Sequence, residues 1–437
     1  MSHTDPRTFM RILSFVFVAT AATLHAQQSA SSQTSPRVLA SRLIAAPDAK
    51  SSALLASPVA VRELPDGRLL VNDTQRRQLL LFDRGLATTT VVADSAGGGA
   101  NSYGAGPGGI IRFVADSTLL VDPAGLSMFV IDPSGRIARV ASVPRSQDAA
   151  ALGNNTSSSP GLDGKGRLIY RGISRVKQVT NGGLTIAEFP DSVDIERVDL
   201  ATRKVDTVGF YKVSKTNMII TQTERGVSIG AELNPVQTVD DWAVLANGSI
   251  AIVRGLDYHV DILNSDGTLA AGPKIPFEWR PLTDDEKVVV LDSARRAIDR
   301  MIANGDAAQM MSMHSGAAPP AGGHGAGGGA TFGSGGGSKN AAPTIKMVSP
   351  SALPDYWPPF AQGAAKSDAD GNLWVRTTAK RANAIGGSIY DVVDSTGLLA
   401  DRIQVPPGRQ IIGFGKNGVV YMAARDGATA WLERTHR

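Results

Sequence analysis

Four arginines are the residues whose types and spacing most suggest a shared chemistry. Each lies at or near the end of a short apolar segment of the kind that forms a strand: Arg171, Arg254, Arg376 and Arg425. A guanidinium group donates two parallel hydrogen bonds to a carboxylate or phosphate, so several of them around one opening would bind an anion. The alternative is that they are solvated loop arginines without a common role.

Acidic, amide and aromatic residues accompany these arginines. Asp257 and Tyr258 follow Arg254 and would be the nearest acid and aromatic contacts of a ligand. Two further segments of the same type end in Asn72, Asp73 and Asp122 instead of an arginine. We predict no catalytic residue and no metal ligand. The predicted ligand-binding set is Arg171, Arg254, Asp257, Tyr258, Arg376 and Arg425.

Two short motifs match catalytic or cofactor signatures but lack the required context. Segment 104–109 (GAGPGG) matches a dinucleotide fingerprint, which needs a helix after the glycines, whereas 110–114 (IIRFV) has the pattern of a strand. Segment 226–230 (GVSIG) matches the serine-hydrolase elbow, which needs a strand-to-helix turn in an α/β sheet. We therefore predict neither a dinucleotide cofactor nor a catalytic Ser228.

Histidines give no metal signature. Of the six, two lie near the N-terminus, His314 and His324 lie in a Gly-rich segment, and His436 is close to the C-terminus. Only His259 falls within a predicted strand, and no pair has the spacing of a zinc site. We predict no cofactor, with calcium retained only under the enzyme alternative given below.

A repeated turn-and-strand unit must position these side chains. Segments such as 66–71 (DGRLLV) and 370–375 (DGNLWV) recur six times, with the second turn residue at Gly67, Ser117, Gly166, Gly248, Gly371 and Gly418. Asp-Gly and Asn-Gly favour tight hairpin turns, because both central residues need positive φ. A second strand-and-turn segment follows each copy, as at 80–83 (LLFD). Each unit is therefore a predicted four-stranded antiparallel meander.

Such a sheet cannot bury both of its faces alone, so neighbouring sheets must stack. Radial stacking predicts an all-β fold, a six-bladed β-propeller of four-stranded antiparallel blades over residues 37–437. We expect segment 37–44 to pair with the last blade and close the ring. A β-sandwich is the alternative, but sandwiches do not repeat one turn at a fixed offset.

The long insertions all fall on one rim of the predicted propeller. They join second to third strands or one blade to the next, so this loop-rich rim is the predicted working face; the alternative is that insertions are merely tolerated there. The largest insertion, 277–359, carries a capping box at 283–286 and an apolar stripe. It predicts a helix over about 283–303 that packs against the propeller, followed by a disordered Gly-rich loop over about 306–342.

The N-terminus and the composition bear on location and partners. Segment 1–26 has the arginines, apolar core and small residues of a signal peptide. There is no cysteine and the net charge is only +4. These features predict a bacterial protein exported to the periplasm or the cell exterior, monomeric, without nucleic-acid binding and without a membrane span in the mature chain.

Segments 64–71 (LPDGRLLV), 369–375 (ADGNLWV) and 390–397 (YDVVDSTG) resemble the repeats of the six-bladed β-propeller superfamily that includes NHL-repeat proteins. The chain is especially similar to exported bacterial members with a helical insertion between blades four and five. The resemblance implies a scaffold that binds a protein, a glycan or a small anionic ligand on the loop-rich rim. The superfamily also includes calcium-dependent lactonases and amidating lyases, so the alternative is a metal-dependent hydrolase or lyase with a cation in the central channel. The sequence leaves catalysis undecided and favours a binding protein.

Overall fold

The computed structural model describes ten stretches of the chain: residues 39–95, 101–104, 108–155, 158–174, 176–181, 184–215, 217–223, 226–303, 344–379 and 386–437. The chain divides into the units Met1–Arg37 and Val38–Arg437, and all described residues belong to the second. The expected signal peptide (1–26) and the whole of the expected Gly-rich loop (306–342) lie outside the described residues.

Within the described residues, six sheets each contain four mutually antiparallel strands, which confirms the predicted type of sheet. The first contains β3 (Pro58–Glu63), β4 (Leu69–Asp73), β5 (Gln78–Phe82) and β6 (Thr89–Asp94). The second contains β7 (Gly109–Arg112), β8 (Thr118–Asp122), β9 (Ser127–Ile131) and β10 (Ile137–Ser142). The third contains β11 (Gly161–Leu162), β12 (Leu168–Arg171), β15 (Ser192–Val198) and β16 (Val205–Lys212).

The fourth sheet contains β19 (Asp241–Val244), β20 (Ile250–Arg254), β21 (His259–Leu263) and β22 (Leu269–Ala271). The fifth contains β24 (Phe360–Ser367), β25 (Leu373–Thr377), β26 (Ser388–Val393) and β27 (Leu399–Val405). The sixth contains β28 (Arg409–Phe414), β29 (Val419–Asp426), β30 (Thr429–His436) and, from the start of the chain, β2 (Ala49–Lys50). Short helical segments are η1 (Val114–Asp116), η2 (Ser146–Asp148), α1 (Ala149–Leu152) and η3 (Pro350–Ala352).

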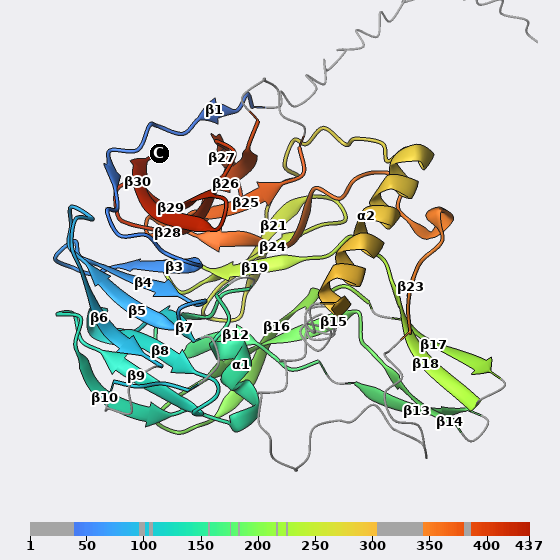
Figure 1. Cartoon of the computed structure of the whole chain (residues 1–437), viewed down its shortest axis with the longest axis horizontal. Helices are drawn as coiled ribbons and strands as arrows, with labels where there is room; N and C mark the ends of the chain where they lie inside the picture. The colour runs from blue at the N-terminus through green and yellow to red at the C-terminus, as the bar shows by residue number, and fades with distance from the viewer. Residues whose placement is uncertain are drawn as a thin grey trace, which may run out of the picture. The chain divides into compact units, whose positions relative to one another are not determined.

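The sheets stack face to face, and their first strands meet around one axis. Strand β28 contacts β3, β3 contacts β7, β7 contacts β11, β11 contacts β19, and β19 contacts β24. An apolar cluster lies between each pair of successive sheets, and the cluster that contains Val71, Phe82, Tyr421 and Leu432 joins the last sheet to the first. Figure 1 shows the first two sheets, β3–β6 and β7–β10, side by side. This radial stacking of antiparallel sheets is a β-propeller.

Closure of the ring differs from the prediction. In the described part of segment 37–44, residues 39–44, the strand β1 (Arg42–Leu43) adds in parallel to β27 of the fifth sheet and not to the last sheet. Arg42 is fixed there by an ion pair with Asp401 at 2.7 Å. The closing strand is β2, which follows in the chain and pairs antiparallel with β30.

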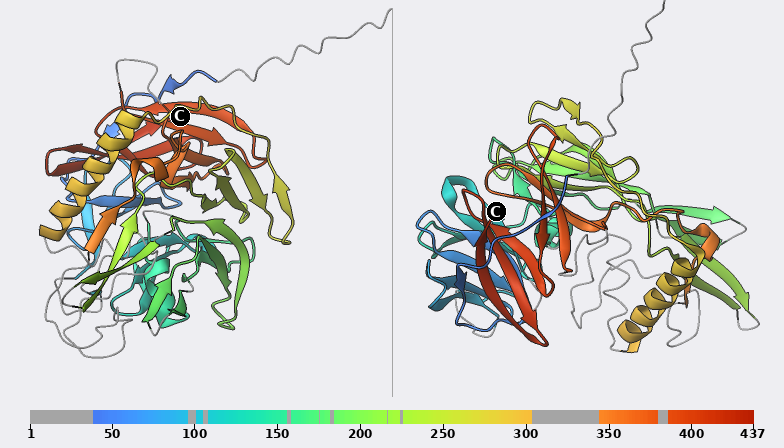
Figure 2. Two further views of the ribbon diagram at one scale, coloured as in Figure 1. Left: turned by 90° about the vertical axis from the view of Figure 1, so that its right-hand side faces the viewer. Right: turned by 90° about the horizontal axis from the view of Figure 1, so that it is seen from above.

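The insertions carry secondary structure of their own. The third sheet is interrupted by the hairpin of β13 (Lys177–Asn181) and β14 (Leu184–Glu188). A separate sheet contains β17 (Asn217–Thr223), β18 (Gly226–Leu233) and β23 (Thr344–Met347), with β23 parallel to β18. In the right-hand view of Figure 2 the gold helix α2 (Asp284–Ala303) lies apart from the red and blue sheets.

The inserted helix begins with the predicted capping box. The backbone N–H of Glu286 donates to Thr283 Oγ1 at 3.3 Å, and the N–H of Thr283 donates to the Glu286 carboxylate at 3.2 Å. Leu291 and Ile298 of the predicted stripe are buried. The expectation that this stripe packs on the propeller was wrong in part, because Ile298 packs against Ala231 and Leu233 of strand β18 in the inserted sheet.

A buried ion pair within the fifth sheet also binds a tyrosine from the fourth sheet. Arg402 binds the carboxylate of Asp391 through Nε at 2.5 Å and Nη2 at 3.0 Å, and Asp391 is wholly buried. The Tyr258 hydroxyl donates to the same carboxylate at 2.8 Å. Arg402 also donates to the backbone oxygens of Leu39 and Pro276. Asp391 therefore holds together groups from three parts of the chain.

Replacing this acid tests its role in stability. Asp391→Ala leaves the Arg402 charge and the Tyr258 hydroxyl buried without their partner, so we expect the free energy of unfolding to fall by about 3–5 kcal/mol. Urea unfolding followed by tryptophan fluorescence measures this loss. The control is Arg136→Ala, which removes a largely exposed pairing with Asp132 and should change stability by roughly 0–1 kcal/mol. A loss for Asp391→Ala no larger than the control would contradict the account.

Candidate functional site

A cavity of about 470 Å³ lies where the first strands of the six sheets converge. Strands β3, β7, β11, β19, β24 and β28, with the turns that follow them, all contribute to its wall. A central channel position is where a propeller can bring side chains from every sheet to one ligand.

One register position recurs in the cavity wall. In each of the six sheets, one residue of the first strand pairs with the equivalent position of the second strand. These first-strand residues are Arg62, Ile110, Gly161, Ala243, Lys366 and Gly413. All of them line the cavity. The two cations belong to the first and fifth sheets, and Gly413 of the sixth sheet lies between them in ring order. Arg62 and Lys366 therefore flank a position that carries no side chain.

The Arg62 guanidinium is held mainly by uncharged acceptors. Its side chain is 13% exposed and donates to Thr118 Oγ1 at 3.0 Å and to the backbone oxygen of Asp116 at 3.2 Å. The nearest carboxylate oxygen, on Asp116, is 3.9 Å away and is shared with Arg112. Burial, followed by the charge of Arg112, lowers the pKa of Arg62 to about 10. The positive charge of Arg62 is thus poorly compensated.

Lys366 on β24 is the second uncompensated cation. It is partly buried and lines the cavity, and no hydrogen bond or ion pair of its ammonium occurs within the described residues. Burial lowers the pKa of Lys366; Asp241 opposes this shift and Arg376 adds to it. A second lysine at the cavity wall, Lys416, is exposed.

The acids of the cavity wall serve the fold. Glu63 accepts a hydrogen bond from the Tyr421 hydroxyl at 2.8 Å. Asp163 accepts from the backbone of its own turn at 2.9 Å, and Asp368 accepts from Trp374 Nε1 at 2.9 Å. Because these carboxylates already have partners, the cavity favours an anionic ligand.

Asp241 fixes the strands beside the cavity. It is wholly buried, and its carboxylate accepts from the backbone N–H of Trp242 at 2.9 Å, from Ser158 Oγ at 3.1 Å and from the N–H of Ala365 at 2.9 Å. Burial raises the pKa of Asp241, and these hydrogen bonds oppose the shift. The bond to Ala365 ties β19 to β24 next to Lys366.

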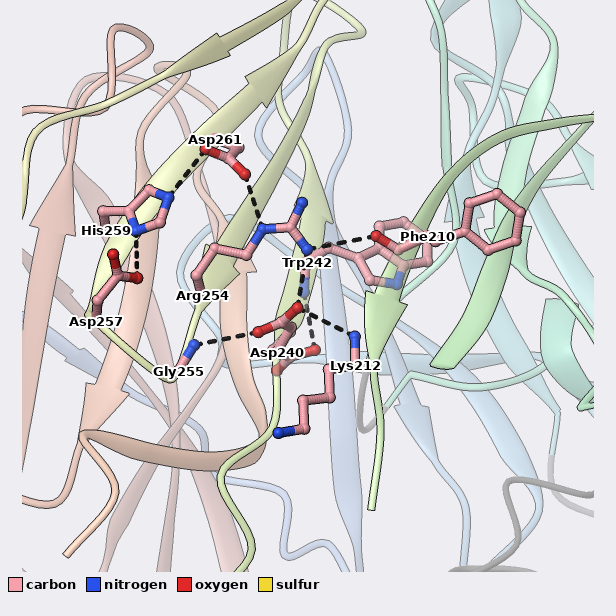
Figure 3. A network of polar contacts seen from close by, with 10 residues as sticks. Phe210, Lys212, Asp240, Trp242, Arg254, Gly255, Asp257, His259 and Asp261 are labelled. Carbon is pink, nitrogen blue, oxygen red and sulfur yellow. Dashed lines mark hydrogen bonds and ion pairs between the residues drawn. The ribbon is translucent and has the colours of Figure 1, made fainter. Parts of the chain in front are cut away.

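The predicted residue Arg254 lies in a network of acids (Figure 3). Its Nε donates to Asp261 at 2.7 Å, and its Nη1 donates to Asp240 at 2.8 Å. The ring of His259 lies between Asp257, at 2.7 Å from Nδ1, and Asp261, at 3.1 Å from Nε2. Two carboxylates therefore balance the Arg254 charge, and Asp257 reaches it only through His259 and Asp261.

The other predicted residues lie elsewhere. Tyr258 is wholly buried, in left-handed backbone with φ 42°, and its hydroxyl belongs to the Asp391 network. Arg376 is exposed, and Arg425 donates to the backbone oxygen of Ala56 at 3.1 Å. Arg171 is partly buried. Within the described residues no hydrogen bond or ion pair joins these arginines to one another, and ligand binding by the set stays a prediction.

The three residues that replace arginine have structural partners. Asp73 accepts from the backbone N–H groups of Ala56 and Ser57, both at 2.8 Å. Asn72 donates to the oxygen of Gly108, and Asp122 accepts from the N–H of Gly104. These buried side chains hold connections on the loop-rich rim.

Metal and membrane features give little further guidance. Over the described stretches, no group of three or more His, Asp or Glu residues is arranged to hold a metal ion. No helix within those stretches is long and apolar enough to cross a membrane.

Comparison with known proteins yields only distant structural likeness. No family model matches the chain, and no curated protein of similar sequence was found. A gluconolactonase from Xanthomonas campestris has 10% identity and a TM-score of 0.37, with 92% of this chain and 99% of that chain covered. A virginiamycin B lyase from Staphylococcus aureus has 10% identity and a TM-score of 0.38, with 89% of this chain and 98% of that chain covered. The calcium-binding regucalcin from Agrobacterium tumefaciens has 12% identity and a TM-score of 0.39, with 91% of this chain and 98% of that chain covered. Such scores support no transfer of function.

Sequence reasoning missed Arg62 and Lys366 because it searched the ends of second strands. Both lie in first strands, shortly before the repeated turns at Gly67 and Gly371. Aligning the residues before each turn would have revealed two cations among small and apolar residues.

The uncompensated charge of Lys366 should appear in the pH dependence of stability. A lysine whose pKa is lowered on folding from 10.5 destabilises the folded state while it is protonated, and this cost disappears as pH rises towards 10.5. We expect Lys366→Met to be at least as stable as the wild type at neutral pH, with the difference shrinking as pH rises. Urea unfolding over a pH series in buffer free of polyvalent anions measures this.

The matched control for that series is Lys416→Met, at an exposed lysine of the same cavity wall. It should show no comparable pH-dependent difference. A Lys366→Met variant that is less stable than the wild type at every pH would show that the ammonium has a stabilising partner.

Proposed function

We propose that the six sheets are the blades of a six-bladed propeller that acts as an exported, monomeric scaffold and binds a small anionic ligand in its central cavity. Export rests on segment 1–26 of the sequence alone. The observation that carries the ligand proposal is the placement of Arg62 and Lys366 at equivalent register positions on either side of Gly413. Neither cation has a carboxylate oxygen closer than 3.9 Å among the described residues.

Burial of an unpaired charge is costly, and an anion between these cations would offset that cost. Arg62 offers a planar set of donors and Lys366 a mobile point charge, a combination suited to a carboxylate or phosphate group. The cavity volume of about 470 Å³ lies within the roughly 300–1,000 Å³ typical of small-molecule sites. This proposal keeps the anionic ligand expected from the sequence and moves its site from the loop-rich rim to the channel.

Thermal unfolding with a panel of anions tests the proposal. Sodium phosphate, succinate and citrate, compared with sodium chloride at equal ionic strength, should include one that raises the melting temperature of the wild type by mass action. Free anion at a hundred times its Kd would stabilise the fold by about 2.7 kcal/mol. Arg62→Gln and Lys366→Gln should each weaken that anion on the order of tenfold, about 1.4 kcal/mol.

The control pair is Arg376→Gln and Arg425→Gln, which removes two exposed arginines predicted for the loop-rich rim. It should leave the anion effect intact. Loss of the effect in this pair, with retention in the cavity variants, would contradict the cavity site and favour the rim. A calcium shift reversed by chelator, without any anion effect, would instead favour the metal-dependent hydrolase or lyase.

A further inference from the structure

Lys366 has aromatic surroundings at the wall of the central cavity. It lies near the end of β24 and is partly buried. Its cross-strand partner on β25 is Trp374, which is only 1% exposed. The Trp374 ring lies 5.1 Å, centroid to centroid, from the ring of Phe414, a second residue of the cavity wall. Residues paired across an antiparallel sheet share one face, so Lys366 leaves β24 on the side of these aromatic rings.

Two acids close to Lys366 are occupied by other donors. Asp368, two residues further along the chain, accepts three hydrogen bonds from its own turn, residues 370–372, and a fourth from Trp374 Nε1. Asp241 accepts from the backbone N–H of Ala365, beside Lys366. Within the described stretches, neither acid forms a hydrogen bond or ion pair with the Lys366 ammonium. The cavity wall therefore supplies no counterion for this charge.

An amine without a counterion gives up its proton more readily, because an ion pair would favour the charged form. Burial lowers the pKa of Lys366 below 10.5; Asp241 opposes this shift and Arg376 adds to it. A larger fraction of this side chain is therefore neutral amine near neutral pH than in an ordinary exposed lysine. The neutral amine is the form that attacks a carbonyl carbon, and burial or a nearby cation is what makes a lysine reactive in this way.

The rest of the ring at the same register position limits what a ligand can carry. The other five residues are one cation and four small or apolar residues: Arg62, Ile110, Gly161, Ala243 and Gly413. Such a wall suits a ligand with one negative group for the guanidinium and a short apolar carbon chain. A small oxo acid has both, together with a ketone or aldehyde carbonyl that an amine can attack.

We infer that Lys366 captures a small oxo acid in the central cavity as a covalent imine. The inference rests on the proposed function, because the carboxylate of the oxo acid is the anion assigned to Arg62. The amine nitrogen bonds to the carbonyl carbon, and the carbonyl oxygen leaves as water with the two hydrogens of the neutral amine. No atom is oxidised or reduced, and hydrolysis reverses the step. Protonation of the imine restores the positive charge that faces the bound anion.

Reductive trapping of the full chain tests the inference. The protein is incubated with sodium pyruvate, 2-oxobutanoate or 4-oxopentanoate and with sodium cyanoborohydride, which reduces an imine to a stable secondary amine. Intact mass and peptide mapping then count and locate the adducts. With at least one of these acids we expect one adduct per chain at Lys366, formed on the order of tenfold faster than at the exposed Lys416.

Lys366→Arg is the matched variant, because it keeps a positive charge at the cavity wall and removes the amine. It should lose the adduct and keep the gain in melting temperature that the oxo acid gives. Arg62→Gln keeps the amine, and it should slow labelling of Lys366 on the order of tenfold because the carboxylate loses its donor. Sodium lactate, which has a hydroxyl in place of the ketone of pyruvate, should give no adduct.

A gain in melting temperature without an adduct at Lys366 would overturn the inference and leave the proposed anion site standing. Labelling spread evenly over Lys366 and Lys416 would also overturn it, since the cavity amine would then have no special reactivity. An adduct that forms equally fast in Arg62→Gln would overturn the assignment of the carboxylate to Arg62. If none of the three acids stabilises or labels the protein, the inference fails, and the anion panel above decides the proposed function separately.

Discussion

Burial of both faces of every sheet is the constraint on which the rest of this structure depends. Along β4, Leu69 and Val71 pack towards the last sheet while Leu70 packs towards the second. No sheet can satisfy both faces alone, so the sheets must stack until the last meets the first. That closure, completed by β2 on β30, brings the first strands edge-on around an axis and creates the central cavity.

The same arrangement of sheets determines which charged side chains have protein partners and which face the cavity without them. Most acids near the axis or the rims hold the chain in place: Glu63 binds Tyr421, and Asp241 ties β19 to β24. Arg254 is balanced by two carboxylates. Arg62 and Lys366 face the cavity without such partners. Because the fold commits its acids elsewhere, anion binding at the axis is the chemistry that its remaining charges favour.

Local signals predicted the fold well, whereas the site depends on register across the sheets. The glycines of the Asp-Gly turns have positive φ, 83° at Gly67 and 93° at Gly371, and the helix appears with its capping box. The expectation of positive φ at both central residues was wrong for these turns, because Asp66 and Asp370 do not have it. The closing strand was misplaced because two-residue strands carry no periodicity. Tyr258 and Arg62 show what the sequence could not predict about side chains. The burial of Tyr258 and the exposure of Arg62 to the cavity both depend on neighbouring sheets that are distant in sequence.

A crystal structure of the protein soaked in sodium selenate would test the central claim most directly, because selenium scatters anomalously and selenate is an oxyanion. The account predicts an anomalous peak in the central cavity, within hydrogen-bond reach of Arg62 and Lys366 and above Gly413. Peaks confined to the loop-rich rim, with none in the cavity, would contradict it.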